Sequence, residues 1–330
     1  MQAILIESNG GPDVLTLRDL PDPQPGPGQV RVDVRAAGVN PVDTYLRAGT
    51  PPYTRPTPFV PGFDAAGVVS AIGEGVTGWM PGQRVYTFGV ATPPGAPGTS
   101  NLNGAYASQV LVEPGQLQHL PEGVSFEAGA CLGVPCGTAY RALFLRGHAR
   151  PGETVLVHGA TGGVGLACCQ FAAAAGLTVF GTGGTEAGRR LAEANGAVRC
   201  FDHHAEGYQD DIRQAAGGGV DLICEMLANV NLDADLDLLS PGGRVLVIGS
   251  RGNIEISPRK TMGQERSVIG VGLLRATPAE LAETHAAVLA GLRAGYLRPV
   301  VEQTFPLAEA GKAHEAVMKS GHQGQVVLTV

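Results

Sequence analysis

Alternating apolar and polar residues mark the first third of the chain as a region of short β-strands. In residues 29–35 the valines alternate with charged or polar side chains, which is the period-two pattern of a strand with one buried face. Residues 65–72 form a second, apolar run, and the turn at Pro81-Gly82 leads into a third strand at 83–86. Residues 90–103 are rich in Gly, Pro, Ser and Asn and are expected to form an exposed loop. The first third is therefore predicted to be an antiparallel β region.

From about Ser125 the pattern changes to strands that alternate with helices. Short β-branched runs predict buried strands, and small-residue or periodic runs that end at Gly predict helices. The strands are expected at 154–157, 177–180, 220–223 and 244–248, and the helices at 165–175 and 185–195. Thr185 is the expected N-cap of the second helix and Gly196 its stop. Such alternation predicts a doubly wound parallel sheet of the α/β class with right-handed crossovers.

The last part of the chain adds one helix and one strand. Thr277-Pro278-Ala279-Glu280 combines a capping box with a proline at the first helical position, so a helix is expected to start there. The chain closes on an apolar strand at 325–330.

Composition and charge narrow the class of protein. The chain has 330 residues, which suggests about two domains of ~150 residues, and its apolar fraction of 44% is enough to fill their cores. A formal net charge of −7 argues against binding of nucleic acid or anionic lipid. The uncharged run at 164–181 is interrupted by Gln170 and Gly176, so we interpret it as a helix, a turn and a strand and expect no membrane span.

The cysteines and the N-terminus indicate a cytoplasmic protein. The six cysteines show no Cys-x-x-Cys spacing, and in a chain with sizeable cores they are expected to be buried thiols in a reducing compartment. The first residues lack a basic start and reach an acid at Glu7, so no signal peptide is expected.

The strongest motif is a glycine loop between a strand and a helix. The strand at 154–157 runs into His158-Gly-Ala-Thr-Gly-Gly-Val-Gly165 and then directly into a helix. Glycines let the backbone approach a pyrophosphate, which binds the free N–H groups at the helix N-terminus. Ala160 stands where the first glycine of Gly-x-Gly-x-x-Gly is usual, so Gly162 and Gly165 carry the pattern. The context predicts a dinucleotide-binding site.

The dinucleotide is expected to be NADPH. NAD-preferring sites place an acid about 20 residues further on, at the end of the next strand, where it binds the ribose 2′-hydroxyl. Residues 181–185 read Gly-Thr-Gly-Gly-Thr and contain no acid. A 2′-phosphate would fit there without charge repulsion, and Thr185, Arg189 and His203 are available donors. A solvated position on the helix is the equal alternative for Arg189.

Metal ligands and hydrolase nucleophiles are missing from the expected patterns. The histidines at 158, 203 and 204 fall into no metal-binding spacing, and no Gly-x-Ser-x-Gly elbow occurs. The chemistry is therefore expected to be that of the cofactor, without a metal, and the protein is expected to orient the reactants.

Six stretches of the chain carry a family signature; they are residues 37–45, 61–67, 137–143, 158–165, 225–231 and 242–252. In these stretches the chain resembles the zinc-independent medium-chain dehydrogenase/reductases, and in particular the zeta-crystallin-like NADPH:quinone oxidoreductases. The resemblance implies a GroES-like β-barrel catalytic domain at 1–124, completed by 274–330. It also implies a Rossmann NADPH-binding domain at 125–273, with the active site in the cleft between the two domains.

The resemblance also assigns site residues. Asn40 and Tyr45 are the implied catalytic residues, near the nicotinamide and the substrate. The implied cofactor contacts are Tyr45, Thr138, Thr161, Gly162, Gly163, Val164, Gly184, His203, Asn231, Ile248, Gly249, Ser250 and Arg251. The chain departs from the family at Gln83, where an acid is usual, and at Gln325, where a Lys is common before the last strand. The second departure removes one charged contact to the cofactor and leaves His322 as a weaker candidate.

Zinc sites are not expected. Zinc-dependent relatives carry a catalytic Cys in the stretch that matches residues 37–43 and a His-Glu pair in the one that matches 61–64. This chain has Asn40 in the first and Phe63-Asp64 in the second, and residues 90–103 lack the cysteines of the structural zinc site.

The implied activity is NADPH-dependent reduction of a quinone, ortho-quinones above all, by electron or hydride transfer. An enone or 2-alkenal reductase on the same fold is the nearest alternative. A non-catalytic structural or RNA-binding protein is an alternative of another class, against which the acidic balance and the intact loop weigh. The apolar segment at 268–273 is expected at a sheet edge, where it would pair two copies into a homodimer, with a homotetramer as the other possibility.

Overall fold

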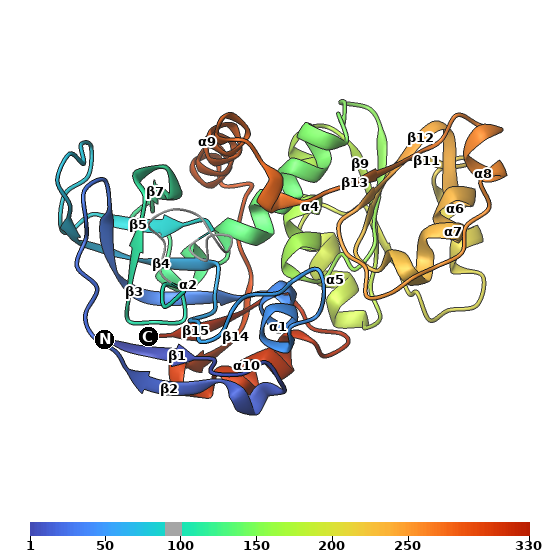
Figure 1. Cartoon of the computed structure of the whole chain (residues 1–330). Helices are drawn as coiled ribbons and strands as arrows, with labels where there is room; N and C mark the ends of the chain where they lie inside the picture. Colours follow the sequence, from blue (N-terminus) through green and yellow to red (C-terminus); the bar gives the residue numbers. More distant parts are fainter. Residues whose placement is uncertain (90–100) are drawn as a thin grey trace. The chain divides into compact units, whose positions relative to one another are not determined.

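The structure is a computed structural model that describes residues 1–89 and 101–330 (Figure 1). The chain divides into two compact units. The amino-terminal unit comprises Met1–Val134, Pro299–Lys319 and Gly324–Val330, and the central unit comprises Pro135–Arg298 and Ser320–Gln323. Most of the loop expected at 90–103 lies outside the described residues.

The amino-terminal unit is built on a seven-stranded sheet, with a separate pair formed by β1 and β2. The strands of the sheet follow the order β14-β15-β3-β4-β5-β7, and β6 pairs with β3. The strand bounds are β1 (Gln2–Leu5), β2 (Thr16–Asp19), β3 (Val30–Val39), β4 (Asp64–Ile72), β5 (Arg84–Thr87), β6 (Gln109–Val112), β7 (Leu117–His119), β14 (Val301–Pro306) and β15 (Gln325–Thr329). The helices are α1 (Pro41–Ala48), α2 (Phe126–Gly129) and α10 (Ala310–Val317), with 3₁₀ turns at Pro12–Val14, Pro114–Gln116 and Leu307–Glu309.

The alternation seen in the sequence places the core of this unit. In β3 the valines at 30, 32 and 34 are buried, while Arg31 and Asp33 between them are partly exposed. The buried valines join one apolar cluster with residues from β1, β4, β6 and β15. The strand predicted at 29–35 is confirmed and runs on to Val39.

The end of the chain completes the same sheet. β15 lies antiparallel to β3, with Val326 opposite Val39 and Thr329 opposite Ala36. Figure 1 shows these two strands, blue for β3 and red for β15, within one unit. Residues near the two ends of the sequence therefore share one sheet.

The central unit contains a six-stranded parallel sheet, which confirms the predicted α/β class. Its strands are β8 (Thr154–Val157), β9 (Thr178–Thr182), β10 (Arg199–Phe201), β11 (Val220–Glu225), β12 (Leu239–Val247) and β13 (Ser267–Gly270). Its helices are α3 (Gly137–Tyr140), α4 (Gly163–Ala174), α5 (Glu186–Ala194), α6 (Tyr208–Ala215), α7 (Ala228–Leu238), α8 (Arg259–Met262) and α9 (Pro278–Ala294). A π-helical turn at Arg141–Arg146 extends α3, a 3₁₀ turn spans Leu273–Arg275, and another π-helical turn, Leu132–Cys136, contains the boundary between the units.

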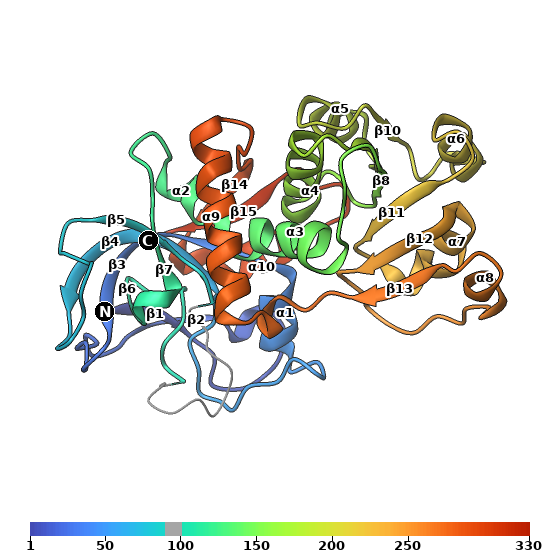
Figure 2. The ribbon, with the colours of Figure 1, turned by 90° about the horizontal axis from the view of Figure 1, so that it is seen from above.

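The strand order reverses in the middle of this sheet. The order is β10-β9-β8-β11-β12-β13, so the chain builds outward from β8 in one direction and then returns to build from β11 in the other. Right-handed crossovers then put α4 and α5 on one face and α6 and α7 on the other. Figure 2 shows α6 and α7 on the side of β11 and β12 that lies away from α4 and α5. The reversal creates a switch point between β8 and β11, where such sheets bind ligands.

Local signals in the sequence predicted several element ends correctly. Thr185 caps α5, since its Oγ1 accepts a bond of 3.1 Å from the N–H of Gly188. The capping box at Thr277 and Glu280 opens α9. The strand expected at 268–273 is shorter than predicted, because β13 ends at Gly270 and a 3₁₀ turn follows. Among the described residues, no helix has the length and apolar character needed to cross a membrane.

The boundaries between the units differ from the predicted ones. We expected divisions after residues 124 and 273, whereas the structure has them after Val134 and Arg298. The helix α9 belongs to the central unit because it packs on α3 there. Glu280 of α9 forms an ion pair of 2.8 Å with Arg141, and Tyr140 donates a bond of 3.0 Å to Glu283. The packing of α9, rather than its place in the sequence, therefore assigns it to the central unit.

Candidate functional site

Most of the predicted cofactor-binding residues follow the carboxyl ends of the parallel strands of the central unit. Residues 161–164 follow β8, residues 184–189 follow β9, His203 follows β10, Asn231 follows β11, and residues 248–251 follow β12. Carboxyl ends of parallel strands lie at one edge of a sheet, and β8 and β11 flank the switch point. The structure therefore gathers this set at the edge where a dinucleotide is expected.

The glycine loop is shaped so that a backbone can approach it closely. A Cβ atom on Gly165 would overlap the carbonyl oxygen of Gly159, so only glycine lets α4 pack against the end of β8. Gly162 precedes the helix and no side chain caps it, which leaves the first N–H groups of α4 for an anion. His322 lies beside this loop, because its carbonyl oxygen accepts a bond of 3.0 Å from the hydroxyl of Thr161. The loop fits the pyrophosphate of a dinucleotide.

The next loop carries a cluster of basic groups around Gly184. A Cβ at Gly184 would lie 2.9 Å from Nε2 of His204 and 3.1 Å from Nε2 of His203, so both imidazoles surround a space that glycine leaves open. The two rings stack edge to face, with centroids 4.3 Å apart. Burial and the neighbouring His204 lower the pKa of His203. Thr185 is exposed, and its hydroxyl oxygen already accepts the bond that caps α5.

An acid that sequence reasoning missed lies beside this cluster. Asp202, at the end of β10, forms an ion pair of 2.9 Å with Arg189, whose NH1 also donates to the carbonyl of Gly183 at 3.1 Å. The hydrogen bond from the N–H of His204 lowers the pKa of Asp202. An acid was expected only at the end of β9, the strand that follows the glycine loop. The carboxylate instead comes from β10, which lies parallel to β9. Its position directly after an apolar strand was the available signal.

Beneath the loops lies a buried cluster of one histidine and two carboxylates. Nε2 of His158 is 2.9 Å from Asp235 and 3.7 Å from Glu225, and all three side chains are at most 5% exposed. Burial acts to lower the pKa of His158, but the charge and hydrogen bond of Asp235, together with Glu225, raise it overall. Burial also raises the pKa of Glu225 to about 7.

This cluster holds the cofactor loops by hydrogen bonds. Nδ1 of His158 contacts the hydroxyl of Thr182 at 3.2 Å, and the N–H of Gly159 donates to the same hydroxyl. Glu225 accepts from the N–H of Leu227 and, at 3.2 Å, from the side chain of Asn231. The predicted contact Asn231 is therefore held by a residue that the sequence did not single out. Asp235 shares the buried face of α7 with Leu232 and Leu236, and that helical spacing was the available signal.

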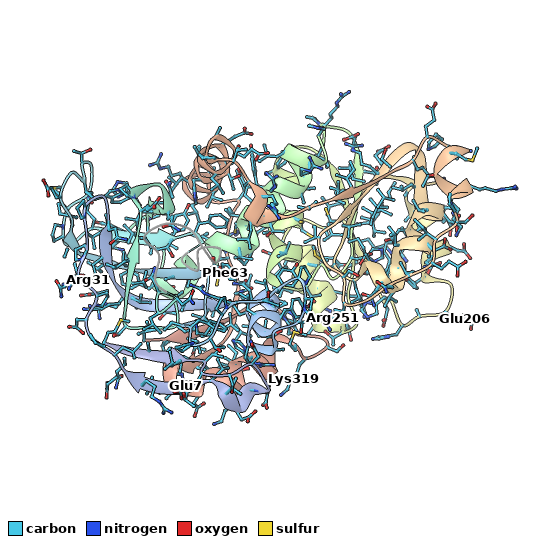
Figure 3. All side chains as sticks on the ribbon, viewed as in Figure 1. Glu7, Arg31, Phe63, Glu206, Arg251 and Lys319 are labelled. Carbon is cyan, nitrogen blue, oxygen red and sulfur yellow. The ribbon has the colours of Figure 1, made fainter. Side chains whose placement is uncertain are left out.

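The loop after β12 is held to α7. The N–H of Arg251 donates to Oδ1 of Asn229 at 2.8 Å, and the hydroxyl of Ser250 donates to the carbonyl of Gly252 at 3.0 Å. Figure 3 labels Arg251 on this loop. Thr138 is not part of the set at the strand ends, because it is buried on α3.

The two predicted catalytic residues belong to the amino-terminal unit, at the start of α1. Asn40 is 2% exposed and precedes the helix, and Asp43 accepts a bond of 2.8 Å from its backbone N–H. Tyr45 lies one turn into the helix and its ring pairs with that of Tyr53, with centroids 5.6 Å apart. Tyr45 is also a predicted cofactor contact and is the only one of them in this unit.

Asn40 and Asp64 contact each other directly. Nδ2 of Asn40 donates to Oδ2 of Asp64 at 2.9 Å, and Oδ1 of Asp64 accepts from the N–H of Val134, also at 2.9 Å. Phe63, labelled in Figure 3, is buried beside Leu46. The two positions where zinc-dependent relatives place ligands are thus joined by a hydrogen bond between an amide and a carboxyl group.

Two buried carboxylic acids flank Asn40. Burial raises the pKa of Asp43 to about 7 and that of Asp64 to about 8. Asp43 also accepts a bond of 3.3 Å from the hydroxyl of Tyr106, which lies 3.1 Å from Nε2 of His314. Burial lowers the pKa of His314 to about 3, so this histidine is neutral and cannot compensate the carboxylates.

Among residues 1–89 and 101–330, only one group of three potential ligands lies close enough together to hold a metal ion. It is His158, Glu225 and Asp235, whose ligand atoms lie within 4.8 Å of one another. Nε2 of His158 already contacts Asp235, and Glu225 already holds Leu227 and Asn231. We therefore interpret the group as an internal ion pair.

Both units match family models of oxidoreductases. Residues 26–122 match the model described as the alcohol dehydrogenase GroES-like domain, and residues 163–289 match the one described as zinc-binding dehydrogenase. Together with the two folds, these matches define a medium-chain dehydrogenase/reductase.

Individual relatives narrow the class. The chain is 46% identical to the human quinone oxidoreductase over 333 residues, which cover 99% of this chain and 97% of the human protein. A crystal structure of the Escherichia coli quinone oxidoreductase complexed with NADPH covers all of both chains at 29% identity, with a TM-score of 0.87. A structure named NAD-dependent alcohol dehydrogenase also covers all of both chains, at 30% identity and a TM-score of 0.92. The chain belongs to the quinone oxidoreductases of the medium-chain dehydrogenase/reductase superfamily.

Proposed function

We propose that the chain is an NADPH-dependent quinone reductase that transfers electrons or hydride from NADPH to a quinone, with ortho-quinones as preferred acceptors. One observation carries the cofactor half of this proposal: five consecutive strands of the central unit present their loops at the edge with the switch point. The full-length likeness to quinone oxidoreductases supports the acceptor half.

The residues of the central unit fit NADPH in two places. The uncapped start of α4 receives the pyrophosphate, and Gly184 leaves room between the imidazoles of His203 and His204 for the 2′-phosphate. Arg189 neutralises Asp202, so that carboxylate does not repel the phosphate. When bound, NADPH supplies the hydride or the electrons, and Thr138, Asn231 and residues 248–251 hold its nicotinamide half.

In the amino-terminal unit, Asn40 and Tyr45 bind and orient the acceptor. An amide N–H and a phenol O–H stabilise negative charge that develops on a quinone oxygen, without either group acting as an obligatory acid. The proposed reaction uses no metal, and the bond between Asn40 and Asp64, which stand at the zinc positions, supports this. The six buried thiols suit a cytoplasmic enzyme.

We also propose that two copies pair through β13 into a homodimer. β13 is the last strand of the sheet, and Val268 on it is 39% exposed. An unpaired apolar edge invites antiparallel pairing across a two-fold axis. Light scattering of the purified chain at micromolar concentration should give twice the monomer mass; a monomer mass contradicts the pairing, and four times the monomer mass shows a tetramer.

The proposed function is tested with the full chain, NADPH and NADH, and a panel of acceptors. Fluorescence titration should give tighter binding of NADPH than of NADH. Steady-state rates with NADPH should be higher for 1,2-naphthoquinone than for a para-quinone or a 2-alkenal. Faster reduction of the alkenal would instead favour an enone reductase, and equal affinity for NADH would overturn the cofactor assignment.

A further inference from the structure

Gln325, at the start of β15, reaches the side chain of Asn40. It is 6% exposed, and its Nε2 donates to the carbonyl oxygen of Val39 at 2.8 Å and to Oδ1 of Asn40 at 3.0 Å. The antiparallel register of β15 with β3, in which Val326 faces Val39, brings the glutamine to this place.

The hydrogen bonds leave the amide of Asn40 only one orientation. The carbonyl of Val39 accepts but cannot donate, so the glutamine must turn its NH₂ group toward it, and the same NH₂ then faces Oδ1 of Asn40. Nδ2 of Asn40 consequently points at Asp64, whose other oxygen accepts from the backbone N–H of Val134. The backbone carbonyl of Val39 thus fixes the direction of the bonds through Gln325 to Asn40.

A flipped Asn40 would face a mismatched group on the side of Gln325. Its NH₂ would meet the NH₂ of Gln325, so the buried bond between the two amides would be lost. In the observed orientation one hydrogen of Nδ2 is bound to Asp64, and the second has no acceptor among the described residues. Under the proposed function, that second N–H is the one that would donate to a substrate oxygen.

We propose that Gln325 is a positioning residue, which directs the second N–H of Asn40 toward the oxygen of the quinone through the bonds among Val39, Gln325, Asn40 and Asp64. The inference rests on the proposed function, because it assumes that Asn40 contacts the acceptor. It assigns a role to a position where the sequence indicated only the loss of a charged cofactor contact.

Two substitutions of Gln325 separate donation from packing. Gln325→Met keeps the length and removes the donor, so kcat with 1,2-naphthoquinone should fall roughly tenfold, the rate equivalent of about one hydrogen bond. Gln325→Lys supplies an ammonium group that can donate to both oxygens, so it should retain kcat within about threefold of the wild type. The Kd of NADPH, measured by fluorescence, should remain unchanged in both. Equal losses in the Met and Lys variants would overturn the proposal.

A double-mutant cycle with Asn40→Leu tests whether the glutamine acts through the asparagine. Asn40→Leu should lower kcat, and adding Gln325→Met should lower it no further. A full tenfold loss in both backgrounds, or wild-type kcat in Gln325→Met beside a slow Asn40→Leu, would overturn the positioning role alone. Wild-type kcat in Asn40→Leu would overturn the role of Asn40 itself and the positioning role with it.

The matched control is Gln170→Met. Gln170 is also 6% exposed, and its Nε2 also donates to a backbone carbonyl, that of Arg298 at 2.9 Å, but it lies in the central unit. The control should lower the midpoint of thermal unfolding as Gln325→Met does and should leave kcat unchanged. A tenfold loss of kcat in the control would show that kcat responds to any buried glutamine, which would contradict the proposal.

Discussion

The amino-terminal and central units each bury a pair of carboxylates, but they compensate the burial in different ways. In the central unit, Asp235 and Glu225 lie against His158, an imidazole whose pKa they raise. In the amino-terminal unit, the donors to Asp64 among the described residues are neutral: the amide of Asn40 and the N–H of Val134. A buried ion pair holds loops firmly in place, whereas a chain of neutral donors fixes the direction of one amide. Under the proposed function, the first cluster would support cofactor binding and the second would support the reaction.

The largest expected effect comes from breaking the ion pair. Asp235→Leu leaves His158 without its closest carboxylate and should lower the free energy of unfolding by about 3–5 kcal/mol. Affinity for NADPH should fall as well, because the same cluster holds the loops at Gly159 and Asn231. Urea denaturation and fluorescence titration measure the two effects.

The control for this variant is an exposed pair. Asp210→Asn removes the partner of Arg213 at 2.6 Å on α6, where the aspartate is 82% exposed, and its unfolding should match the wild type. If Asp235→Leu were no less stable than this control, the two clusters would not differ in the way stated here.

A pH series of unfolding examines the cluster around Asn40. The pKa of Asp64 is about 8 in the folded chain and near 3.8 in the unfolded one, so between these values the folded state holds a proton that the unfolded state has lost. Stability should therefore fall as pH rises from 4 to 8, by about 1.4 kcal/mol per pH unit for such a group. Asp43, with a pKa of about 7, adds a loss of the same sign up to that pH.

Asp64→Asn should flatten this slope, because the substituted side chain does not titrate. The wild-type slope has a further contribution from Glu225 and His158, whose raised pKa values also make stability fall as pH rises. A slope in Asp64→Asn as steep as that of the wild type would mean that Asp64 is ionised at neutral pH despite its burial.

A smaller effect is expected at the predicted catalytic tyrosine. If Tyr45 orients the acceptor and is not an obligatory acid, Tyr45→Phe removes one bond to a polarised oxygen worth ~1.5–3 kcal/mol. kcat/KM with a quinone should then fall roughly tenfold to a hundredfold and no further. A loss of several more decades with NADPH binding intact would reveal an essential proton donor, as enone reduction requires.

The smallest effect concerns the acid beside the phosphate site. Asp202→Asn frees Arg189 from its ion pair of 2.9 Å, and NADPH should bind roughly two- to fivefold more tightly while NADH changes less. Arg189→Ala should weaken NADPH selectively. Titration of both variants with both nucleotides gives the result, and equal changes for NADPH and NADH would place Arg189 away from the 2′-phosphate.

Local sequence signals predicted the central sheet and its glycine loop because those features depend on neighbours in the chain. A strand that runs through glycines into a helix needs small residues at fixed offsets, and among the glycines of this loop Gly165 has the closest neighbour, the carbonyl oxygen of Gly159. The caps at Thr185 and Thr277 depend on three following residues and were predicted for the same reason.

Contacts between distant segments were not predictable in this way. Asp202 joins Arg189 because β10 lies beside β9, and α9 joins the central unit because its face fits α3. The burial of Asp64 in an apolar stretch was a signal that sequence reasoning passed over.

The sequence by itself determined the α/β alternation, the β-rich first third, the phosphate-binding loop and the absence of an acid at residues 181–185. Each of these features depends on residues that are close together in the chain. Only the tertiary structure decided which groups surround Asn40. Gln325 lies 285 positions away and reaches it through the register of β15 on β3. The physical reason is that sheet pairing and burial act between segments that no local pattern relates, and they alone convert separate polar residues into one directed set of hydrogen bonds.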